Sequence, residues 1–251
     1  MHNMKGIVVR KKKFAQDHFI LWIKPTEPLH FEPGQYITVG KEGTERPYSI
    51  ASAPHEENIE LFLEVVPKTL ETNQSLTPRL YALEPGEEVQ LRPHAKGKFT
   101  LNPTATTHIM IATVTGIAPF VSMVRAYLHG YYKRTFEKTI YVFQGASYQD
   151  ELGYDTELSL AAQKGAVVYI PSISRPQEER NKNWKGQTGR VNLILNEYLQ
   201  RFHLSPNDQT TVYLCGNKGM IEYLGNKREK PEKPLGTLVQ AGFKIREEVF
   251  F

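Results

Sequence analysis

The sequence predicts two domains of different fold class, an antiparallel β-domain over residues 1–102 and an α/β domain with a parallel sheet over 103–251. Three observations support this division. The chain has 251 residues, more than a typical domain of about 150. Its first part contains short apolar runs with period-two alternation between turn clusters, which is typical of an antiparallel barrel or sandwich. Its second part alternates strand-like apolar runs with helical apolar spacing, which is typical of a parallel sheet.

The first domain is expected to consist of short strands. They are the runs Gly6–Arg10, Phe19–Ile23, Tyr36–Val39, Ile59–Val66 and Glu88–Leu91. Turn clusters such as Glu32–Gly34 and Glu84–Gly86 separate them, because proline and glycine favour turn conformations. We expect the segment Arg46–Ser52 to close the strand that begins at Gly34.

The second domain is expected to start after a linker at Asn102–Thr107. Its buried parallel strands should be His108–Ala112, Thr139–Phe143, Ala166–Ile170 and Thr211–Leu214. Helical apolar spacing predicts helices at Ala118–His129, Asp155–Lys164 and Arg190–Phe202, with a short helical run at Met220–Leu224.

Composition excludes several functional classes. The single cysteine, Cys215, cannot form a disulfide framework, an iron–sulfur cluster or a thiolate zinc site. The eight histidines show no metal-ligand spacing and no Gly-x-Ser-x-Gly element is present, so we expect neither a metal centre nor a hydrolase. No apolar run reaches the roughly 18 residues of a membrane span, and no signal-peptide core follows the N-terminus. We therefore expect a cytoplasmic protein.

The net charge of +4 is too small to imply nucleic-acid binding. Residues 1–102 hold 13 basic and 13 acidic side chains, whereas residues 103–251 hold 18 basic and 14 acidic ones. The whole excess therefore belongs to the second domain. It suits a phosphate-rich ligand there, although a solvated helix face would give the same count.

The segment Arg46-Pro47-Tyr48-Ser49 offers a guanidinium, an aromatic ring and a hydroxyl within four residues. Such a set can bind a diphosphate and stack on a planar ligand. Strand alternation would place Arg46 and Tyr48 on one face and Ser49 on the other. On spacing alone, the segment is more simply a polar edge strand with one core tyrosine.

Two turns follow predicted strands of the second domain. Thr115–Phe120 opens a helix with Pro119 in its first turn, and Cys215-Gly216-Asn217 precedes the run at Met220. Turns at the carboxyl ends of parallel strands meet at one crevice, where helix amides bind phosphate. Ser174-Arg175 and Gly189-Arg190 are expected near the same crevice. Taken singly, each feature also fits an ordinary turn, a buried small cysteine or a surface arginine.

In combination, four segments resemble the ferredoxin/flavodoxin–NADP reductase family, and more closely its bacterial branch. Arg46–Ser49 is similar to that family's flavin motif, and Ser75–Leu80 followed by Glu84–Glu87 is similar to its flavin-pyrophosphate loop. Thr115–Phe120 and Leu214–Met220 are similar to its pyridine-nucleotide turn and its late Cys-Gly-Asn motif. The resemblance implies an FAD-binding antiparallel β-barrel at 1–102 and a Rossmann-like NADP-binding domain at 103–251.

The resemblance also implies the site residues. The FAD contacts would be Arg46, Pro47, Tyr48, Ser49, Leu63, Glu64, Val65, Ser75, Leu76, Thr77, Thr115, Phe250 and Phe251. The NADP contacts would be Thr115, Gly116, Ser147, Ser174, Arg175, Arg190, Gly216, Asn217 and Met220. The catalytic residues would be Ser49, Cys215 and Glu248, and no metal would be bound.

The implied reaction is hydride transfer between NADPH and FAD, with single electrons passing to or from ferredoxin or flavodoxin. The partner would be a separate acidic carrier, and the protein a monomer. At the chain end, Glu248-x-Phe250 is similar to a late Glu-x-aromatic motif, so Phe250 would cover the flavin and Phe251 would pack near its adenine. A final strand with one ring in the core is the simpler interpretation of the same residues.

Three positions depart from the family pattern. Val114 and Gln74 stand where glycine is usual, and Ser147 stands where the bacterial relatives tend to have an arginine for the 2′-phosphate. Two alternatives therefore stay open. One is an NADH-using reductase that serves a haem protein, an oxygenase or free flavin. The other is a flavin-binding electron-transfer subunit whose nucleotide site has decayed at Val114.

Overall fold

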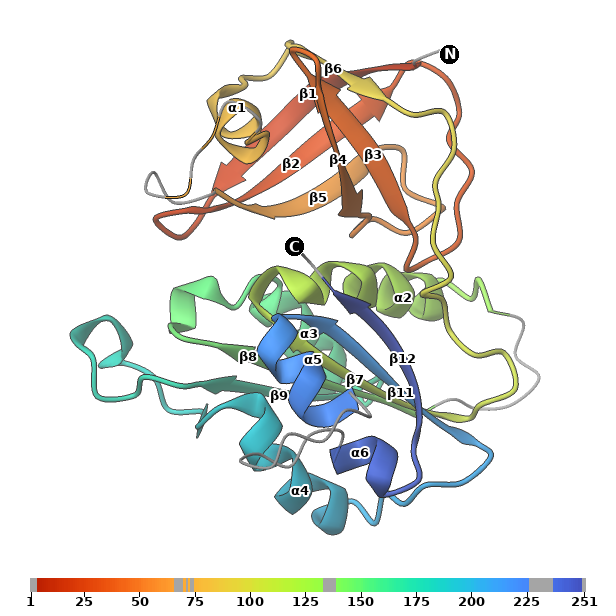
Figure 1. The fold of residues 1–251 in the computed structure, drawn as a ribbon, viewed down its shortest axis with the longest axis vertical. Helices are drawn as coiled ribbons and strands as arrows, with labels where there is room; N and C mark the ends of the chain where they lie inside the picture. The colour runs from red at the N-terminus through yellow and green to blue at the C-terminus, as the bar shows by residue number, and fades with distance from the viewer. Residues whose placement is uncertain are drawn as a thin grey trace. The chain divides into compact units, whose positions relative to one another are not determined.

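The computed structural model describes residues 4–65, 70, 72, 75–132, 139–225 and 237–249. The chain forms two compact units (Figure 1). One, called the barrel unit here, comprises Met1–Thr100 and Ala118–Tyr132. The other, the sheet unit, comprises Leu101–Ile117 and Lys133–Phe251. Within the described ranges, no helix has the length and apolar character needed to cross a membrane.

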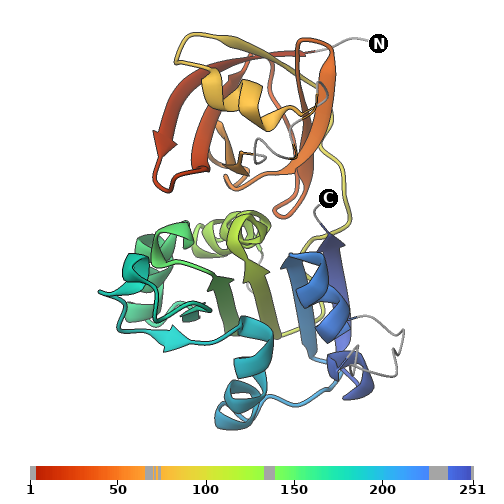
Figure 2. The same ribbon diagram turned by 60° about the vertical axis from the view of Figure 1, so that its left-hand side comes forward.

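The barrel unit contains a six-stranded antiparallel sheet in the order β4-β3-β6-β1-β2-β5, as the sequence predicts. Its strands are β1 (Met4–Lys13), β2 (His18–Pro25), β3 (Tyr36–Lys41), β4 (Thr44–Ser49), β5 (Ile59–Glu64) and β6 (Glu88–Leu91). The short helix α1 (Thr77–Ala82) lies against these strands (Figure 2) and buries Leu80 in their core.

The expectation that Arg46–Ser52 closes the strand begun at Gly34 is wrong. Arg46–Ser49 belong to β4, which pairs with β3 in a hairpin. Glu42 and Gly43 form its turn with φ values of 49° and 77°. Consecutive positive φ values match the twist of a two-residue hairpin, so the chain reverses there. The tight turn therefore makes two strands out of one predicted strand.

The barrel is nearly closed because residues after β4 bond to β5. The amide of Ala51 donates to the carbonyl of Glu60 at 2.8 Å, and the amide of Glu60 donates to Ser52 Oγ at 3.1 Å. Alternate strand residues, including Phe19, Leu21, Ile37 and Leu61, fill the interior. These bonds bring the two edge strands of the sheet together.

Helix α2 (Ala118–Leu128) packs within the barrel unit, although it directly follows a strand of the sheet unit in sequence. Ser122 Oγ donates to the carbonyl of Ser52 at 2.7 Å, and Arg125 Nη1 lies 2.7 Å from Glu60 Oε2. The Phe120 and Phe99 ring centroids are 5.7 Å apart. The boundary between residues 102 and 103 remains a prediction from the sequence.

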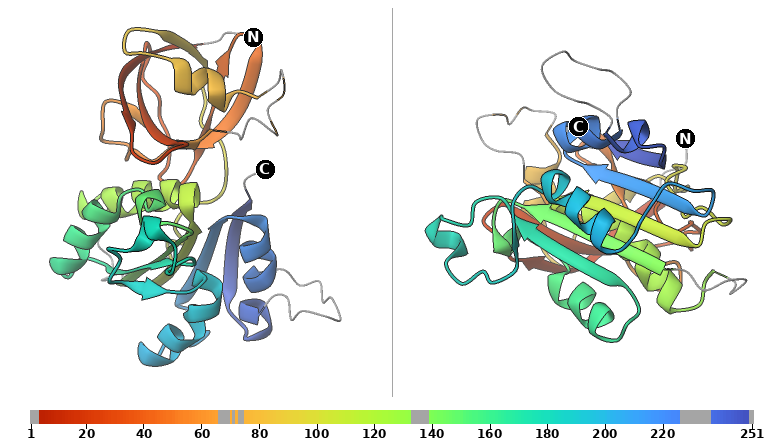
Figure 3. Two further views of the ribbon diagram at one scale, coloured as in Figure 1. Left: turned by 90° about the vertical axis from the view of Figure 1, so that its left-hand side faces the viewer. Right: turned by 90° about the horizontal axis from the view of Figure 1, so that it is seen from below.

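The sheet unit contains six parallel strands in the order β10-β9-β8-β7-β11-β12. They are β7 (Thr107–Thr113), β8 (Thr139–Ala146), β9 (Val168–Ile173), β10 (Gln187–Thr188), β11 (Thr210–Gly216) and β12 (Lys244–Val249). Its helices are α3 (Asp155–Gln163), α4 (Val191–Arg201), α5 (Lys218–Gly225) and α6 (Thr237–Gln240). Helices α4, α5 and α6 cover one face and α3 lies on the other (Figures 1 and 3).

Most predicted elements of this unit lie within one or two residues of the observed ones. The strand expected at Ala166–Ile170 instead begins at Val168. The amide of Ala166 donates to the carbonyl of Ala161 while Gly165 has a φ of 71°, so both residues close the end of α3. Strand β12 supplies the expected final strand, but Phe250 and Phe251, which distinguish the two interpretations of the chain end, lie outside the described residues.

Candidate functional site

The turn after β7 has an unusual backbone. Val114 has a φ of 44°, in the left-handed region that disfavours β-branched residues. It begins the 3₁₀ turn η2 (Val114–Ile117), and its half-buried side chain packs against a small cluster of Ala146, Leu152 and Ile173. Such strain persists only where the surrounding structure imposes it, and it gathers at functional sites.

The turns after β7 and β11 are bonded to each other. The amide of Asn217 donates to Thr113 Oγ1 at 2.7 Å. A Cβ on Gly116 would lie 2.3 Å from the carbonyl oxygen of Cys215, and a Cβ on Gly216 would lie 2.3 Å from Thr113 Oγ1. Both positions therefore require glycine. The structure thus brings together the two turns that the sequence predicts to share a crevice.

Three predicted nucleotide contacts lie in or directly after these two turns, at the carboxyl edge of the parallel sheet. Thr115 is half-buried in η2, and Asn217 Oδ1 accepts a hydrogen bond from the amide of Gly219 at 2.8 Å at the start of α5. Met220, only 5% exposed, belongs to the hydrophobic core, so little of its side chain is open to a ligand.

Cys215 and Glu248 are direct partners in the register of β11 and β12. Burial raises the pKa of the Cys215 thiol well above its usual value, and the nearby charge of Glu248 adds to this effect. The thiol is therefore protonated at neutral pH and is a poor nucleophile.

The loops after β8 and β9 are joined by one buried amide. Asn181 Nδ2 donates to the carbonyl of Ser147 at 3.0 Å and to that of Arg175 at 2.8 Å, while its Oδ1 accepts from the amide of Gln149 at 2.8 Å. The backbone amides of Ser147 and Tyr148 donate to Glu151 Oε2 at 3.1 and 3.2 Å. A carboxylate of the chain itself therefore holds the amides that would otherwise be free for an anion.

The side chain of Tyr148 lies between two arginines. Arg175 Nη1 donates to the Tyr148 hydroxyl at 2.9 Å, and the guanidinium of Arg180 lies 4.0 Å from the ring centre. Glu178 accepts a hydrogen bond from the same hydroxyl and lies 3.5 Å from Arg175. The predicted phosphate ligand Arg175 is therefore already engaged.

Ser174 and Arg190, the remaining predicted NADP contacts, lie close in sequence to the loops after β8 and β9. The amide of Ser174 donates to the carbonyl of Ala146 at 2.9 Å. Arg190 precedes α4 and has an exposed side chain. Ser174 directly follows the carboxyl end of β9, and Arg190 lies two residues beyond the carboxyl end of β10, which pairs with β9.

In the barrel unit, β4 presents the predicted flavin segment. Arg46 is exposed and its Nη1 donates to the carbonyl of Glu45 at 2.7 Å, and Pro47 is exposed beside it. Tyr48 packs half-buried against the barrel core, and this burial raises the pKa of its hydroxyl, with Arg46 opposing. Ser49 is buried opposite Tyr36.

The other predicted flavin contacts lie around β5 and α1. Leu63 is 3% exposed in the barrel core, Glu64 is exposed, and Val65 packs against that core. Ser75 Oγ accepts from the amide of Thr72 at 2.9 Å. Leu76 and Thr77 are both buried where α1 begins.

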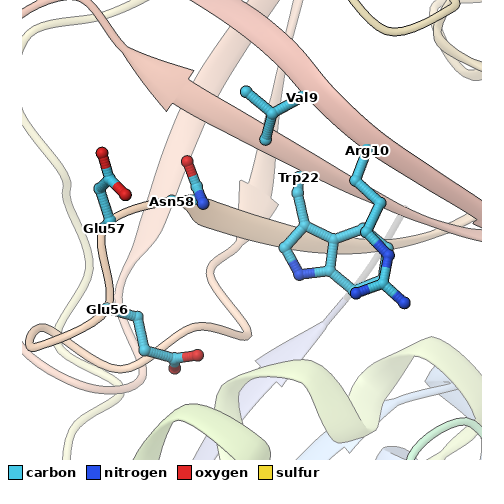
Figure 4. A pocket seen from close by; sticks show the side chains of 6 residues that line it. All are labelled: Val9, Arg10, Trp22, Glu56, Glu57 and Asn58. Carbon is cyan, nitrogen blue, oxygen red and sulfur yellow. The ribbon is translucent and has the colours of Figure 1, made fainter.

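The barrel unit also has a pocket of about 480 Å³ that none of the predicted flavin residues lines (Figure 4). A guanidinium stacks on an indole at its wall, with Arg10 4.4 Å from the ring centre of Trp22. The other lining residues are Val9, Glu56, Glu57 and Asn58.

The structure does not test every prediction. Gln74, Phe250 and Phe251 lie outside the described residues. Ser49 belongs to the barrel unit, whereas Cys215 and Glu248 belong to the sheet unit. Sequence reasoning missed Tyr148, Glu178 and Asn181. Tyr148 lies five residues beyond the predicted strand Thr139–Phe143, and nothing in the sequence pairs it with Glu178 or Asn181.

The comparisons with known proteins agree with these turns and with the fold. Residues 110–225 match the family model "Oxidoreductase NAD-binding domain". The flavodoxin/ferredoxin–NADP reductase of Buchnera aphidicola subsp. Baizongia pistaciae is 30% identical over 234 residues, which cover 87% of each chain. The chain belongs to the ferredoxin/flavodoxin–NADP reductase family.

Other members of the ferredoxin/flavodoxin–NADP reductase family give the same result. The ferredoxin–NADP reductase of Azotobacter vinelandii is 33% identical over 213 residues, 77% of this chain and 76% of its own. A ferredoxin NADP⁺ reductase from Neisseria gonorrhoeae, solved with bound FAD and NADP, shares the fold with a TM-score of 0.75 at 19% identity and covers 98% of each chain. The protein is accordingly an oxidoreductase of this family.

Proposed function

We propose that this chain is an FAD-dependent reductase that exchanges electrons between NADPH and ferredoxin or flavodoxin. The observation that carries the proposal is the pair of turns held by the Thr113–Asn217 hydrogen bond, in which Gly116 and Gly216 leave no room for a side chain. Two glycine turns at the carboxyl edge of a parallel sheet suit a nucleotide. Membership of the family supports the same proposal.

The residues of β4 fit FAD. When bound, FAD accepts a hydride and releases single electrons. The exposed guanidinium of Arg46 can bind a diphosphate, and the neutral ring of Tyr48 can stack on a planar group. Ser49 would offer its hydroxyl, and the Ser75–Thr77 segment would add contacts to the phosphates. Phe250 would shield the flavin face, and Phe251 would pack near the adenine.

The residues of the sheet unit fit a pyridine nucleotide. Thr115, Gly116, Gly216 and Asn217 would line its pyrophosphate and nicotinamide side. Ser147, Ser174, Arg175 and Arg190 would receive the 2′-phosphate of NADPH. Protonated Cys215 and the carboxylate of Glu248 would border the reacting ring rather than attack it.

The partner would be an acidic electron carrier, because the basic excess of the chain belongs to residues 103–251. The chain itself has one cysteine and cannot hold an iron–sulfur cluster, so single electrons would pass to a separate acceptor. A monomeric state and a cytoplasmic location stay predictions from the sequence.

Anaerobic titration of the purified yellow protein tests the proposal. NADPH should bleach the flavin absorbance near stoichiometry, NADH should do so less readily, and ferredoxin or flavodoxin should restore the colour. Arg46→Ala should weaken FAD by about ten- to a hundredfold, since a charge-assisted contact of roughly 1.5–3 kcal/mol is lost. Arg10→Ala, a change at another exposed arginine of the barrel unit, should leave FAD affinity unchanged. A colourless protein that takes up no FAD would refute the assignment.

A further inference from the structure

Around Tyr148, the described loops after β8 and β9 place three carboxylates against two guanidinium groups where a 2′-phosphate is expected. Arg175 and Arg180 are the cations. Asp150, Glu151 and Glu178 are the anions, and each lies within 3.5 Å of one of these guanidinium groups. A dianionic phosphate entering here meets a neutralised site rather than an open pair of arginines.

Glu178 is the anion that engages Arg175. Its carboxylate lies 3.5 Å from Arg175 Nη1 and also accepts a hydrogen bond from the Tyr148 hydroxyl, which itself accepts one from Arg175 at 2.9 Å. The three side chains therefore form a closed triangle, called the Tyr148 clamp below. The Arg175 side chain is 54% exposed and therefore still faces solvent.

The backbone fixes Glu178 in the clamp. The amide of Glu178 donates to the carbonyl of Arg175 at 3.2 Å, and the amide of Asn181 donates to the carbonyl of Glu178 at 2.8 Å. Asn181 is 2% exposed and also holds the carbonyls of Ser147 and Arg175. The backbone of Glu178 is therefore held close to Arg175, and its half-exposed carboxylate reaches the guanidinium and the Tyr148 hydroxyl from there.

We propose that Glu178 is a specificity-determining residue that lowers the selection of NADPH over NADH by occupying Arg175 and repelling the 2′-phosphate. The proposal rests on the proposed nucleotide site. A phosphate that binds the solvent-facing side of Arg175 lies close to the like charge of the Glu178 carboxylate, which costs free energy. A ribose 2′-hydroxyl carries no charge and meets no such cost.

Calorimetric binding of NADP⁺ and NAD⁺ to the holoprotein tests this inference, with adenosine 2′,5′-bisphosphate and 5′-AMP as probes that do not involve the flavin. Glu178→Gln should tighten NADP⁺ and the bisphosphate by about five- to tenfold, because the carboxylate charge is lost while the shape is kept. NAD⁺ and 5′-AMP should change by less than twofold. Glu179→Gln, at the neighbouring carboxylate that pairs with Lys182, should change none of the four affinities.

A second variant assigns the gain to Arg175. In the Arg175→Ala background, Glu178→Gln should tighten NADP⁺ far less, since the occupied cation is gone. Unchanged or weaker binding of NADP⁺ by Glu178→Gln in the native background would overturn the inference while leaving the proposed function intact. Failure of the unaltered protein to bind any of the four ligands would instead refute the nucleotide site itself, and the inference with it.

Discussion

Val114 adopts a backbone conformation that is unfavourable for its own residue type. Its φ of 44° is a conformation that glycine adopts without strain, yet the residue is β-branched. The backbone is fixed by its neighbours, since Thr113 binds the turn after β11 and Gly116 lies against Cys215. The side chain recovers some free energy by packing against Ala146 and Ile173.

The strain at Val114 can be measured by comparing two truncations. Both Val114→Gly and Val114→Ala lose the packing of the side chain, but only glycine relieves the roughly 1–2 kcal/mol cost of a left-handed L-residue. Glycine also loses about 0.5–1 kcal/mol of chain entropy. We therefore expect Val114→Gly to be more stable than Val114→Ala by up to about 1 kcal/mol in urea unfolding.

The same pair of changes at Val142, which is buried in the middle of β8, provides the control. There the alanine variant should be the more stable one, because glycine weakens a strand. Higher stability of alanine at both positions would show that Val114 does not adopt the left-handed conformation in solution.

At the scale of elements, a few buried polar contacts connect segments distant in sequence. Glu60 in β5 and Arg125 in α2 form an ion pair whose side chains are 4% and 17% exposed. Tyr213 in β11, which is fully buried, accepts a hydrogen bond from the amide of Asn102 at 2.8 Å and lies 3.0 Å from His108 Nδ1. The first contact holds α2 against the barrel, and the second holds the segment before β7.

Removing the charge of Glu60 should destabilise the protein. Glu60→Gln keeps the side-chain shape but leaves Arg125 with the weaker partner Glu56, 3.4 Å away. Breaking a buried pair typically costs about 3–5 kcal/mol, and we expect about 2–3 kcal/mol here because Glu56 remains. Glu57→Gln, in the exposed pair with Lys24, should have no measurable effect on urea unfolding. Equal stability of both variants would show that the buried pair does not anchor α2.

The buried hydroxyl of Tyr213 leads us to expect that the folded protein loses stability at alkaline pH. Burial raises the pKa of its hydroxyl from 10.0 to about 12, so the folded chain keeps this proton at pH values where the unfolded chain releases it. The free energy of unfolding should therefore fall as pH rises from 10 to 12, by about 2–3 kcal/mol from this group, and show no such dependence below pH 10.

Tyr213→Phe checks this prediction. It should be less stable than the native protein at pH 8, because the amide of Asn102 loses its acceptor. The difference should shrink between pH 10 and 12, since phenylalanine does not ionise. Parallel pH profiles for the two proteins would mean that the hydroxyl titrates normally in the folded state.

At the scale of the whole molecule, the charge distribution affects the encounter with the proposed acidic electron carrier. The net charge of +4 comes entirely from residues 103–251, although part of it is neutralised locally by pairs such as Arg180–Asp150. A modest positive excess speeds encounters with an acidic carrier without providing much affinity.

Electron transfer to an acidic ferredoxin or flavodoxin should therefore slow as salt rises. Between about 0.01 and 0.3 M ionic strength the screening length falls from roughly 30 Å to below 10 Å, and the steering field shortens with it. Stopped-flow reoxidation of the reduced flavin measures this rate. A small uncharged acceptor should show no dependence on salt, and equal behaviour of the two acceptors would argue against electrostatic steering.

The sequence alone determined the two fold classes, most strands and helices, and the turns after β7 and β11. These features depend on the spacing of apolar residues, on the positions of glycine and proline, and on short motifs. All of these can be recognised within a few neighbouring residues. The strand at Arg46–Ser49 was misjudged because a two-residue hairpin turn at Glu42–Gly43 carries little signal of its own. Strand β9 was placed two residues early because Gly165 and Ala166 serve the preceding helix.

Only the tertiary structure decided which side chains meet. Thr113 and Asn217 are 104 residues apart, and Tyr148 and Glu178 are 30 apart, yet each pair forms a hydrogen bond. Such contacts depend on the order and register of the parallel strands, because adjacent strands here are joined by long connections whose length is not written in any local pattern. The sequence could therefore identify Arg175 as a candidate phosphate ligand, but only the folded sheet shows that Arg175 already pairs with Glu178.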